Sequence, residues 1–321
     1  MPAGAISYIE GCSFGIVAII GLSMNFTVLL AMVKGKLFSS KSSPVYILSS
    51  QTITVDSILL LVHLLYQCPS VMLQSYLFPV GMQPSILTAL NATFMYCWYH
   101  NTLGHILIAI NRLCVIVFYR IPIFTRRRTI ALCVLQHILA LAFSTTSQFL
   151  LPCCEFAFSW TVFSYQYNAK PGIVNYSNEF IDLPLNSSSS LISILAYTAI
   201  ICKMRYSRLL TKDLERSAVR LMHKEYRYAI QFATMALVYL LTWTFFRAFP
   251  VLIGTTNNLH VYGVVTILAE MNMLTNSAVY LVNNAEIKKS IRAMVSGPAQ
   301  VAAVSTFEST MSNIGTTTVT A

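Results

Sequence analysis

The chain has 321 residues, of which 56% are hydrophobic and 10% are charged, and its mean hydropathy is +0.64. A soluble domain carries about 25% charged residues, so these values exclude a soluble domain and indicate one integral membrane bundle. The net charge of +10 does not indicate nucleic-acid binding, because the basic residues lie between apolar segments rather than on one exposed surface.

Seven apolar segments are long enough to cross a bilayer as helices, which requires about 20 residues. None alternates with the period of a barrel strand, so the expected fold is an all-α integral membrane bundle of seven transmembrane helices. The expected spans are residues 8–33, 45–67, 84–114, 129–151, 188–210, 226–253 and 261–282. No basic segment precedes the first span, which is therefore expected to act as a signal anchor.

The basic residues predict the orientation of this bundle. All of the 21 lysines and arginines except Lys170 and Arg247 fall on or near one side of it. The positive-inside rule places that side in the cytoplasm and the short N-terminus, residues 1–7, outside the cell. Acceptor sequons at Asn175 and Asn186 lie in the fourth connector, which this topology places outside, so both are candidate glycosylation sites.

The C-terminal region divides into two parts. Residues 285–295 place Ile287, Ile291 and Met294 on one helical face and basic residues on the other, which predicts an amphipathic eighth helix along the inner leaflet. Residues 296–321 are rich in Ser, Thr, Gly and Ala and are expected to form a disordered cytoplasmic tail. The tail is either simply solvated or a target of a kinase and of arrestin.

Cysteine usage suggests one disulfide bond. Cys68, Cys153 and Cys154 are expected to face the oxidising outside, so a bridge from Cys68 to either of the other two is a candidate. The remaining cysteines are expected to pack inside the bundle. No catalytic constellation and no metal-ligand spacing stands out, so neither an enzyme nor a cofactor is expected.

Polar residues inside the apolar spans are the candidate functional groups. Asp56 lies in the middle of the second span, where a carboxylate needs polar partners. Asn25, Asn101, Asn272 and Asn276 lie at depths compatible with meeting it, so we expect a hydrated polar cluster. Asp56, Asn101 and Asn276 are also a candidate sodium site. The alternative is that each amide only joins neighbouring helices. Arg112 lies at the inner end of the third span, beside a basic loop.

Several of these residues form a pattern along the chain. It consists of Gly21-x-x-x-Asn25, Asp56, Asn111-Arg112-Leu113 and Asn276-Ser277-x-x-Tyr280, followed by the amphipathic helix. The pattern resembles rhodopsin-like G-protein-coupled receptors, with Asn-Arg-Leu where that family usually has Asp-Arg-Tyr, and Asn-Ser-x-x-Tyr where it has Asn-Pro-x-x-Tyr.

A narrower resemblance is to nematode serpentine chemoreceptors of class x. It rests on Leu-Ile-Ala-Ile-Asn-Arg-Leu-Cys at residues 107–114, on Ile-Phe-Thr at 123–125 and on Leu-Pro-Cys at 151–153. The resemblance implies a receptor in the plasma membrane of a sensory neuron, which binds an odorant or pheromone-like small molecule and activates a heterotrimeric G protein. The alternative is a seven-helix ligand-gated channel or small transporter.

The ligand pocket of such a receptor is expected in the outer half of the bundle. The candidate pocket residues are Phe94, Met95, Trp98, Tyr99, Trp243 and Glu270. Packing in the core is the alternative for the aromatic residues, and Glu270 could anchor a cation or donate when protonated. Residues 261–282 contain no lysine, which excludes a retinal Schiff base.

The resemblance also implies activation residues, namely Asn111, Arg112, Glu225, Asn276 and Tyr280. Glu225 lies 18 residues before Trp243, about five helical turns, and therefore near the cytoplasmic end of the sixth helix. There it could pair with Arg112 as a latch of the inactive state, although a local pair with Lys224 or Arg227 is the alternative. Asn111 is a neutral amide where the family has a carboxylate, so Arg112 would depend more heavily on Glu225.

The latch makes a testable prediction. Glu225→Ala is expected to raise basal G-protein signalling, because the substitution removes the carboxylate that would hold Arg112. Signalling would be compared with that of the unmodified chain at equal surface expression, and unchanged basal signalling would count against the latch.

Overall fold

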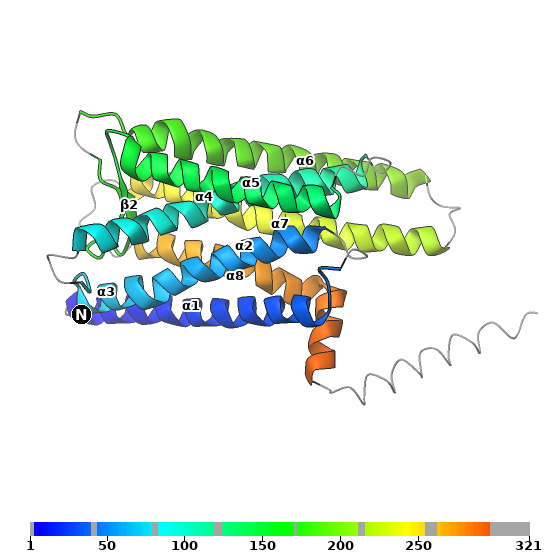
Figure 1. The fold of residues 1–321 in the computed structure, drawn as a ribbon, viewed down its shortest axis with the longest axis horizontal. Helices are drawn as coiled ribbons and strands as arrows, with labels where there is room; N and C mark the ends of the chain where they lie inside the picture. The colour runs from blue at the N-terminus through cyan, green and yellow to red at the C-terminus, as the bar shows by residue number, and fades with distance from the viewer. Residues whose placement is uncertain are drawn as a thin grey trace, which may run out of the picture.

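The computed structural model describes residues 3–39, 44–78, 83–118, 124–169, 172–210, 216–253 and 262–295. The segment expected to form the disordered tail, residues 296–321, lies outside these residues. Long helices lie side by side along the molecule, with the N-terminus and a small hairpin at one end and residues 285–295 at the other (Figure 1). We call these ends the hairpin end and the basic end.

The helices form seven spans, as the sequence predicts. They are α1 (Ala3–Lys34), α2 (Val45–Val62), α3 (Cys68–Leu73), α4 (Gln83–Ile116), α5 (Arg126–Thr145), α6 (Leu183–Leu210), α7 (Arg216–Ile253) and α8 (Gly263–Asn283). The second span comprises both α2 and α3, because the π-helical turn η1 (His63–Gln67) joins them without a break. Each span is long enough to cross a bilayer.

The third span, α4, differs from the others in polarity. The six other spans are apolar enough to cross a membrane by length and composition alone. In α4, His100, Asn101 and Arg112 are all buried. Because α4 packs against α2, α5, α6 and α7, these polar side chains face other helices rather than lipid.

In the described residues, three π-helical turns lie within or beside the spans: η1, η2 (Thr146–Leu150) and η3 (Asn178–Asp182). Pro69 lies four residues after a residue of η1, and Pro184 lies four residues after a residue of η3. A proline has no N–H, and its ring clashes with the carbonyl four residues earlier, so a wider turn at that point relieves the clash. Because η3 precedes α6, the fifth span begins well before the expected residue 188.

The fourth connector contains a hairpin that the sequence did not predict. Strands β1 (Phe156–Ser159) and β2 (Ser164–Tyr167) are antiparallel, with Phe156 opposite Tyr167. Asn91 of α4 accepts a hydrogen bond from the backbone N–H of Phe158 at 3.1 Å. The Thr266 hydroxyl on α8 donates to the Phe163 carbonyl at 2.9 Å. The hairpin is therefore fastened to two helices and covers this end of the bundle.

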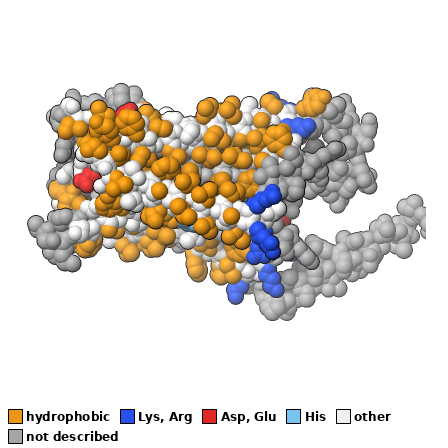
Figure 2. Space-filling model, turned by 45° about the horizontal axis from the view of Figure 1, so that its top comes forward, with side chains coloured by type: hydrophobic (Ala, Val, Ile, Leu, Met, Phe, Trp, Pro, Cys, Tyr) orange, Lys and Arg blue, Asp and Glu red, His pale blue; other side chains and the backbone are white. Residues whose placement is uncertain are grey.

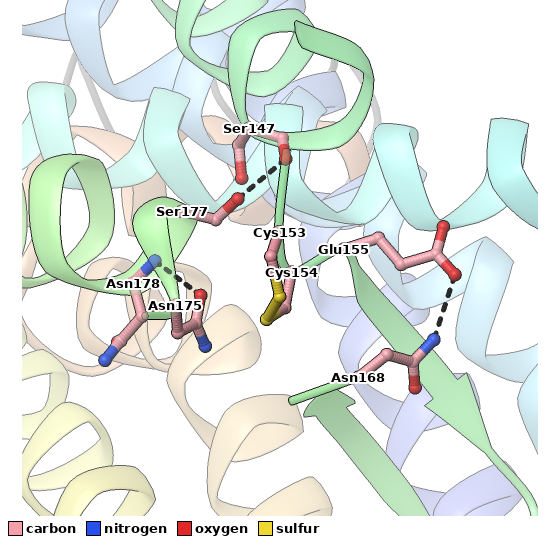
Figure 3. The surroundings of a disulfide bond; sticks show 8 residues. All are labelled: Ser147, Cys153, Cys154, Glu155, Asn168, Asn175, Ser177 and Asn178. Atoms are coloured by element: carbon pink, nitrogen blue, oxygen red, sulfur yellow. Dashed lines mark hydrogen bonds between the residues drawn. A yellow bond between two sulfur atoms is a disulfide. The ribbon is translucent and has the colours of Figure 1, made fainter. Parts of the chain in front are cut away.

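The expected disulfide bond from Cys68 is wrong. Cys153 is bonded to its neighbour Cys154 instead (Figure 3). Cys68 is a buried thiol that faces α1, where its Sγ would lie 3.9 Å from a Cβ placed on Gly15. The position of Cys68 inside the bundle thus separates it from the connector that carries the other two cysteines.

Hydrogen bonds fix the connector around this disulfide. The Ser177 hydroxyl donates to the Ser147 carbonyl at 2.7 Å, and the Asn168 amide donates to Glu155 Oε1 at 2.9 Å (Figure 3). The first bond joins the start of the fifth span to the end of the fourth. The second joins the two sides of the hairpin at its base.

The surface has the pattern of a membrane protein. Apolar side chains cover the length of the bundle, whereas Lys and Arg side chains gather at the basic end (Figure 2). The exposed basic residues of this end include Lys34, Lys36, Arg126, Arg127, Arg128, Lys289 and Arg292. Apolar side chains around the bundle suit contact with lipid tails, and the basic end suits contact with anionic lipid headgroups.

The amphipathic helix spans residues 285–295 and lies across the basic end (Figure 1). Asn284 caps its N-terminus, because its Oδ1 accepts a hydrogen bond from the backbone N–H of Ile287 at 3.0 Å. Ile287 is fully buried, and Ile291 and Met294 pack against the core of the bundle. The apolar face expected from the sequence is therefore present, and it packs on the bundle itself.

The packing of α1 generates a prediction about stability. A Cβ placed on Gly21 would lie 2.8 Å from Leu60 Cδ1 and 3.3 Å from Leu274 Cβ, whereas a Cβ on Gly4 of the same helix would have no atom within 4 Å. Gly21→Leu is therefore expected to lower the free energy of unfolding by about 1–3 kcal/mol, because α1 must move away from α2 and α8.

Gly4→Leu is the matched control, since it makes the same chemical change where there is space. Thermal unfolding of both variants in detergent would be compared with that of the unmodified chain. Equal melting temperatures for the two variants would contradict the close packing at Gly21.

Candidate functional site

A cavity of about 40 Å³ lies beneath the hairpin, among the helices. We call it the inner cavity. Its volume accommodates one or two water-sized groups, and its wall is mostly aromatic or apolar. It is lined by His63, Phe94, Met95, Trp98, Phe156, Ser164, Tyr165, Tyr167, Asp182, Thr242, Phe246, Val265, Thr266 and Ala269.

Three of the expected pocket residues, Phe94, Met95 and Trp98, line this cavity. Tyr99 does not; it is buried and meets Phe143 of α5 edge to face, with 6.2 Å between the ring centroids. The sequence therefore predicted the depth of these residues along α4, but it did not predict which face of α4 each of them occupies.

The sixth span shows the same effect. Thr242 and Phe246 of α7 line the inner cavity, whereas the expected Trp243 does not. Positions four apart share a helix face, while successive residues point roughly 100° apart around the axis. Trp243 instead lies beside Arg247, whose Cζ is 5.8 Å from the centroid of the indole ring.

Glu270 was expected to contact a ligand, but its carboxylate is paired with another side chain. Its Oε1 lies 3.0 Å from His63 Nδ1, and both side chains are buried. His63 lines the inner cavity, and its ring lies beside the rings of Phe94 and Tyr165 at centroid distances of 6.0 and 6.1 Å. The group that meets the cavity is therefore His63, with Glu270 behind it.

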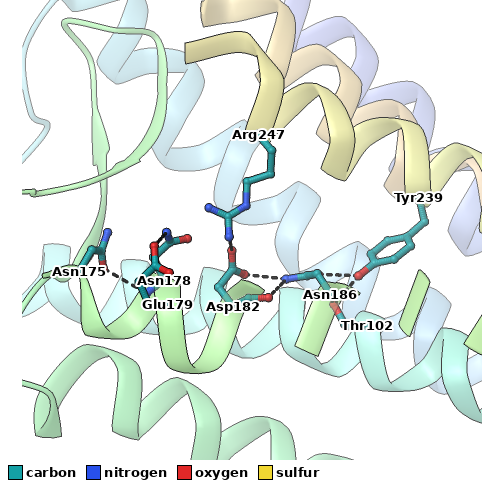
Figure 4. Close-up of polar contacts among 8 residues, drawn as sticks. All are labelled: Thr102, Asn175, Asn178, Glu179, Asp182, Asn186, Tyr239 and Arg247. Atoms are coloured by element: carbon teal, nitrogen blue, oxygen red, sulfur yellow. Dashed lines mark hydrogen bonds and ion pairs between the residues drawn. The ribbon is translucent and has the colours of Figure 1, made fainter. Parts of the chain in front are cut away.

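A second acid–base pair lies on another side of the cavity, between η3 and α7. Arg247 Nη2 lies 3.6 Å from Asp182 Oδ2, and Asp182 also accepts a hydrogen bond from the Asn186 amide at 2.7 Å (Figure 4). Asp182 is almost completely buried. Its charge is thus balanced by Arg247 and solvated by Asn186, as a buried carboxylate requires.

Asn186 is not a glycosylation site, contrary to the expectation from its sequon. It is fully buried, and its Oδ1 accepts hydrogen bonds from the Tyr239 hydroxyl at 2.5 Å and the Thr102 hydroxyl at 3.1 Å (Figure 4). A glycan needs an exposed amide. Asn175 is only partly buried, and its glycosylation stays a prediction.

Asp56 connects three helices in the middle of the bundle. Its Oδ1 accepts from the Asn101 amide at 2.6 Å, and its Oδ2 accepts from the Asn276 amide at 2.7 Å. Asn25 lies nearby but bonds with Ser277 at 2.5 Å instead. Asn101 and Asn276 thus meet Asp56 as expected, whereas Asn25 and Asn272 do not hydrogen bond with it in the described part of the chain. Sodium binding by Asp56, Asn101 and Asn276 stays a prediction.

Arg112 is enclosed by aromatic rings at the basic end. It is 1% exposed, and its Cζ lies 4.8 Å from the ring centroid of Phe232 and 5.4 Å from that of Tyr228. A cation over an aromatic face gains about 2 kcal/mol when it is desolvated. These contacts connect α4 to α7.

Of the other activation residues expected from the sequence, Asn111 and Tyr280 lie near this arginine, whereas Asn276 bonds with Asp56 in the middle of the bundle. Tyr280 is buried, hydrogen bonds with the Ser49 hydroxyl, and meets Phe232 edge to face at 6.2 Å. Asn111 is also buried, at 1% exposure. The side chain of Glu225 lies outside the described residues, so the Arg112–Glu225 latch stays a prediction.

Sequence reasoning missed His63, Asp182 and the Asp182–Arg247 pair. One signal was available in the sequence, because Pro69 and Pro184 closely follow the π turns that contain His63 and Asp182. A proline within a membrane span often marks a wider turn whose neighbours face a cavity. The aromatic residues of the hairpin gave no comparable signal.

Comparisons with known proteins agree with this geometry. The crystal structure of squid rhodopsin superposes with a TM-score of 0.73 at 16% sequence identity, covering 91% of this chain and 85% of that one. At this identity the likeness concerns the fold. No curated protein matches the chain significantly. The sequence profile of the family "Serpentine type 7TM GPCR chemoreceptor Srx" matches residues 16–284, and the chain belongs to this family of chemoreceptors.

Proposed function

We propose that this chemoreceptor binds a small molecule at its hairpin end and activates a heterotrimeric G protein at its basic end. In this proposal the receptor lies in the plasma membrane of a sensory neuron with its N-terminus outside the cell. The observation that carries the proposal is the enclosure of Arg112 by aromatic rings of α7, at the opposite end from a cavity that lies among the same helices.

The distribution of charge supports the orientation. Basic side chains gather at the end that carries residues 285–295, and anionic lipids of the cytoplasmic leaflet attract such residues (Figure 2). The hairpin and the disulfide between Cys153 and Cys154 lie at or near the other end, and disulfides persist in the oxidising space outside the cell. Both features favour the same orientation.

A series of contacts along α8 supports communication between the two ends. Glu270 contacts His63 at the cavity, Asn276 contacts Asp56 in the middle, and Tyr280 contacts Phe232, one of the rings around Arg112. A ligand shifts the equilibrium between two states only by its differential affinity for them. In this proposal the ligand favours the state in which α7 has moved away from Arg112.

The experiment that tests this function is a substitution at the aromatic contact. Phe232→Leu keeps an apolar side chain but removes the ring over Arg112. The loss of about 1 kcal/mol of cation–π energy from one state corresponds to about a fivefold shift in the equilibrium. Basal nucleotide exchange on a panel of G-protein α-subunits, measured in membranes, is therefore expected to rise by up to about fivefold.

Phe26→Leu is the matched control, because it makes the same chemical change at a residue of α1 that is 68% exposed. It is expected to leave basal exchange unchanged at equal surface expression. Equal exchange for the two variants would contradict the restraint of Arg112. Absence of exchange on every α-subunit, with the unmodified chain and with Phe232→Leu, would contradict G-protein activation itself.

The orientation generates a second prediction. If the hairpin end faces outside, a glycan on Asn175 gives the protein from eukaryotic cells a mobility shift that an N-glycosidase removes. Asn175→Gln is expected to abolish the shift, and Asn186→Gln to retain it in the protein that folds, because Asn186 is buried. Glycosylation at Asn175 would be contradicted if Asn175→Gln leaves the mobility shift in place, or if the unmodified chain shows no shift.

A further inference from the structure

The inner cavity contains polar atoms without partners. Among the described residues, His63 Nε2 and Tyr165 Oη are buried and have no hydrogen-bond partner, and both residues line the cavity. Leaving such a group unpaired is unfavourable, and buried polar groups in native proteins are mostly paired. Two together at one cavity indicate that a bound molecule or water supplies the missing hydrogen bonds.

His63 is the better positioned of the two. Its Nδ1 is held by Glu270 at 3.0 Å, its ring lies beside those of Phe94 and Tyr165, and the side chain is 1% exposed. The second ring nitrogen, Nε2, lies on the edge of the ring away from Glu270. Glu270 itself does not line the cavity. A hydroxyl group can donate to Nε2 or accept from it, so a hydroxyl suits either tautomer of the ring.

The charges around the cavity favour an uncharged ligand. Glu270 is paired with His63, and Asp182 is paired with Arg247. Burial raises the pKa of the Tyr165 and Tyr167 hydroxyls above the ordinary value, so both remain neutral donors. A charged head group in the inner cavity would therefore be buried without a counter-ion of its own, because Arg247 does not line that cavity.

The shape of the site suggests where the rest of the ligand lies. A second cavity of about 340 Å³, which we call the outer cavity, shares Ser164, Tyr165, Tyr167, Phe246 and Val265 with the inner one. Ligand sites usually enclose about 300–1,000 Å³, so the inner cavity alone suits a head group and the two together suit a small molecule. The shared aromatic side chains favour a compact apolar body.

We propose that the receptor binds an uncharged small molecule with a compact, aromatic or apolar body and a hydroxyl group, and that His63 Nε2 is the atom that binds the hydroxyl. Glu270 is a positioning residue, which acts by orienting the His63 ring. This proposal rests on the proposed function and names the ligand class of the same site. It replaces the sequence-based expectation that Glu270 itself anchors a cation.

Four probes with one ring and different head groups test the proposal: benzyl alcohol, toluene, benzoate and benzylammonium. Binding to the full chain in lipid nanodiscs would be measured by ligand-detected NMR, with empty nanodiscs to subtract partitioning into lipid. Benzyl alcohol is expected to bind about tenfold more tightly than toluene, the effect of one buried hydrogen bond. The two charged probes are expected to bind more weakly than the alcohol.

His63→Phe keeps a flat ring of similar size but removes Nε2, so the preference for benzyl alcohol over toluene is expected to disappear. His137→Phe is the matched control, because His137 bonds with Tyr96 away from the inner cavity; it is expected to keep the preference. Glu270→Leu is expected to weaken the preference, and Glu270→Gln to restore it, since an amide can still hold Nδ1. A residue with only a structural role would not show this pattern.

Three results would overturn the proposal: a charged probe that binds as tightly as the alcohol, a preference that survives His63→Phe, or no binding of the alcohol. None of them bears on basal nucleotide exchange, which tests G-protein activation without any ligand. Failure of the ligand proposal is therefore distinguishable from failure of the proposed function.

Discussion

The carboxylate of Asp56 is the interaction on which the arrangement of the bundle depends. It lies in the middle of the second span and is 1% exposed, so neighbouring side chains must supply hydrogen bonds to it. Asn101 and Asn276 each donate a hydrogen bond to it, so α2, α4 and α8 must meet at this level. The inner cavity lies on one side of this junction and Arg112 on the other, and α8 contacts both regions.

Much of the fold follows from hydropathy and charge, because a bilayer requires each span to satisfy its own backbone. The seven spans, the amphipathic helix and the contacts of Asp56 could therefore be predicted from depth along each helix. The sequence predicts less well which face of a helix each residue occupies. A π turn adds a residue, which rotates everything beyond it by roughly 100°, and three such turns lie near the hairpin end.

The errors at the site have this physical origin. Asn186 follows η3 and turns into the bundle, where it bonds with Asp182 and Tyr239, although its sequon suggested an exposed loop. Cys68 follows η1 and faces α1 rather than the connector above it. The hairpin depends on hydrogen bonds to Asn91 and Thr266 from distant helices, which no local pattern of its own residues encodes.

The two ends of the bundle are held by different kinds of interaction. At the hairpin end, the buried His63–Glu270 pair joins η1 to α8, and the Asp182–Arg247 pair, whose arginine side chain is 25% exposed, joins η3 to α7. Removing one partner of a buried charged pair costs about 3–5 kcal/mol. At the basic end, contacts of about 2 kcal/mol between Arg112 and the rings of Phe232 and Tyr228 join α4 to α7. In the proposed function, a ligand that keeps both pairs intact would shift α7 about its hairpin end, with the largest displacement beside Arg112.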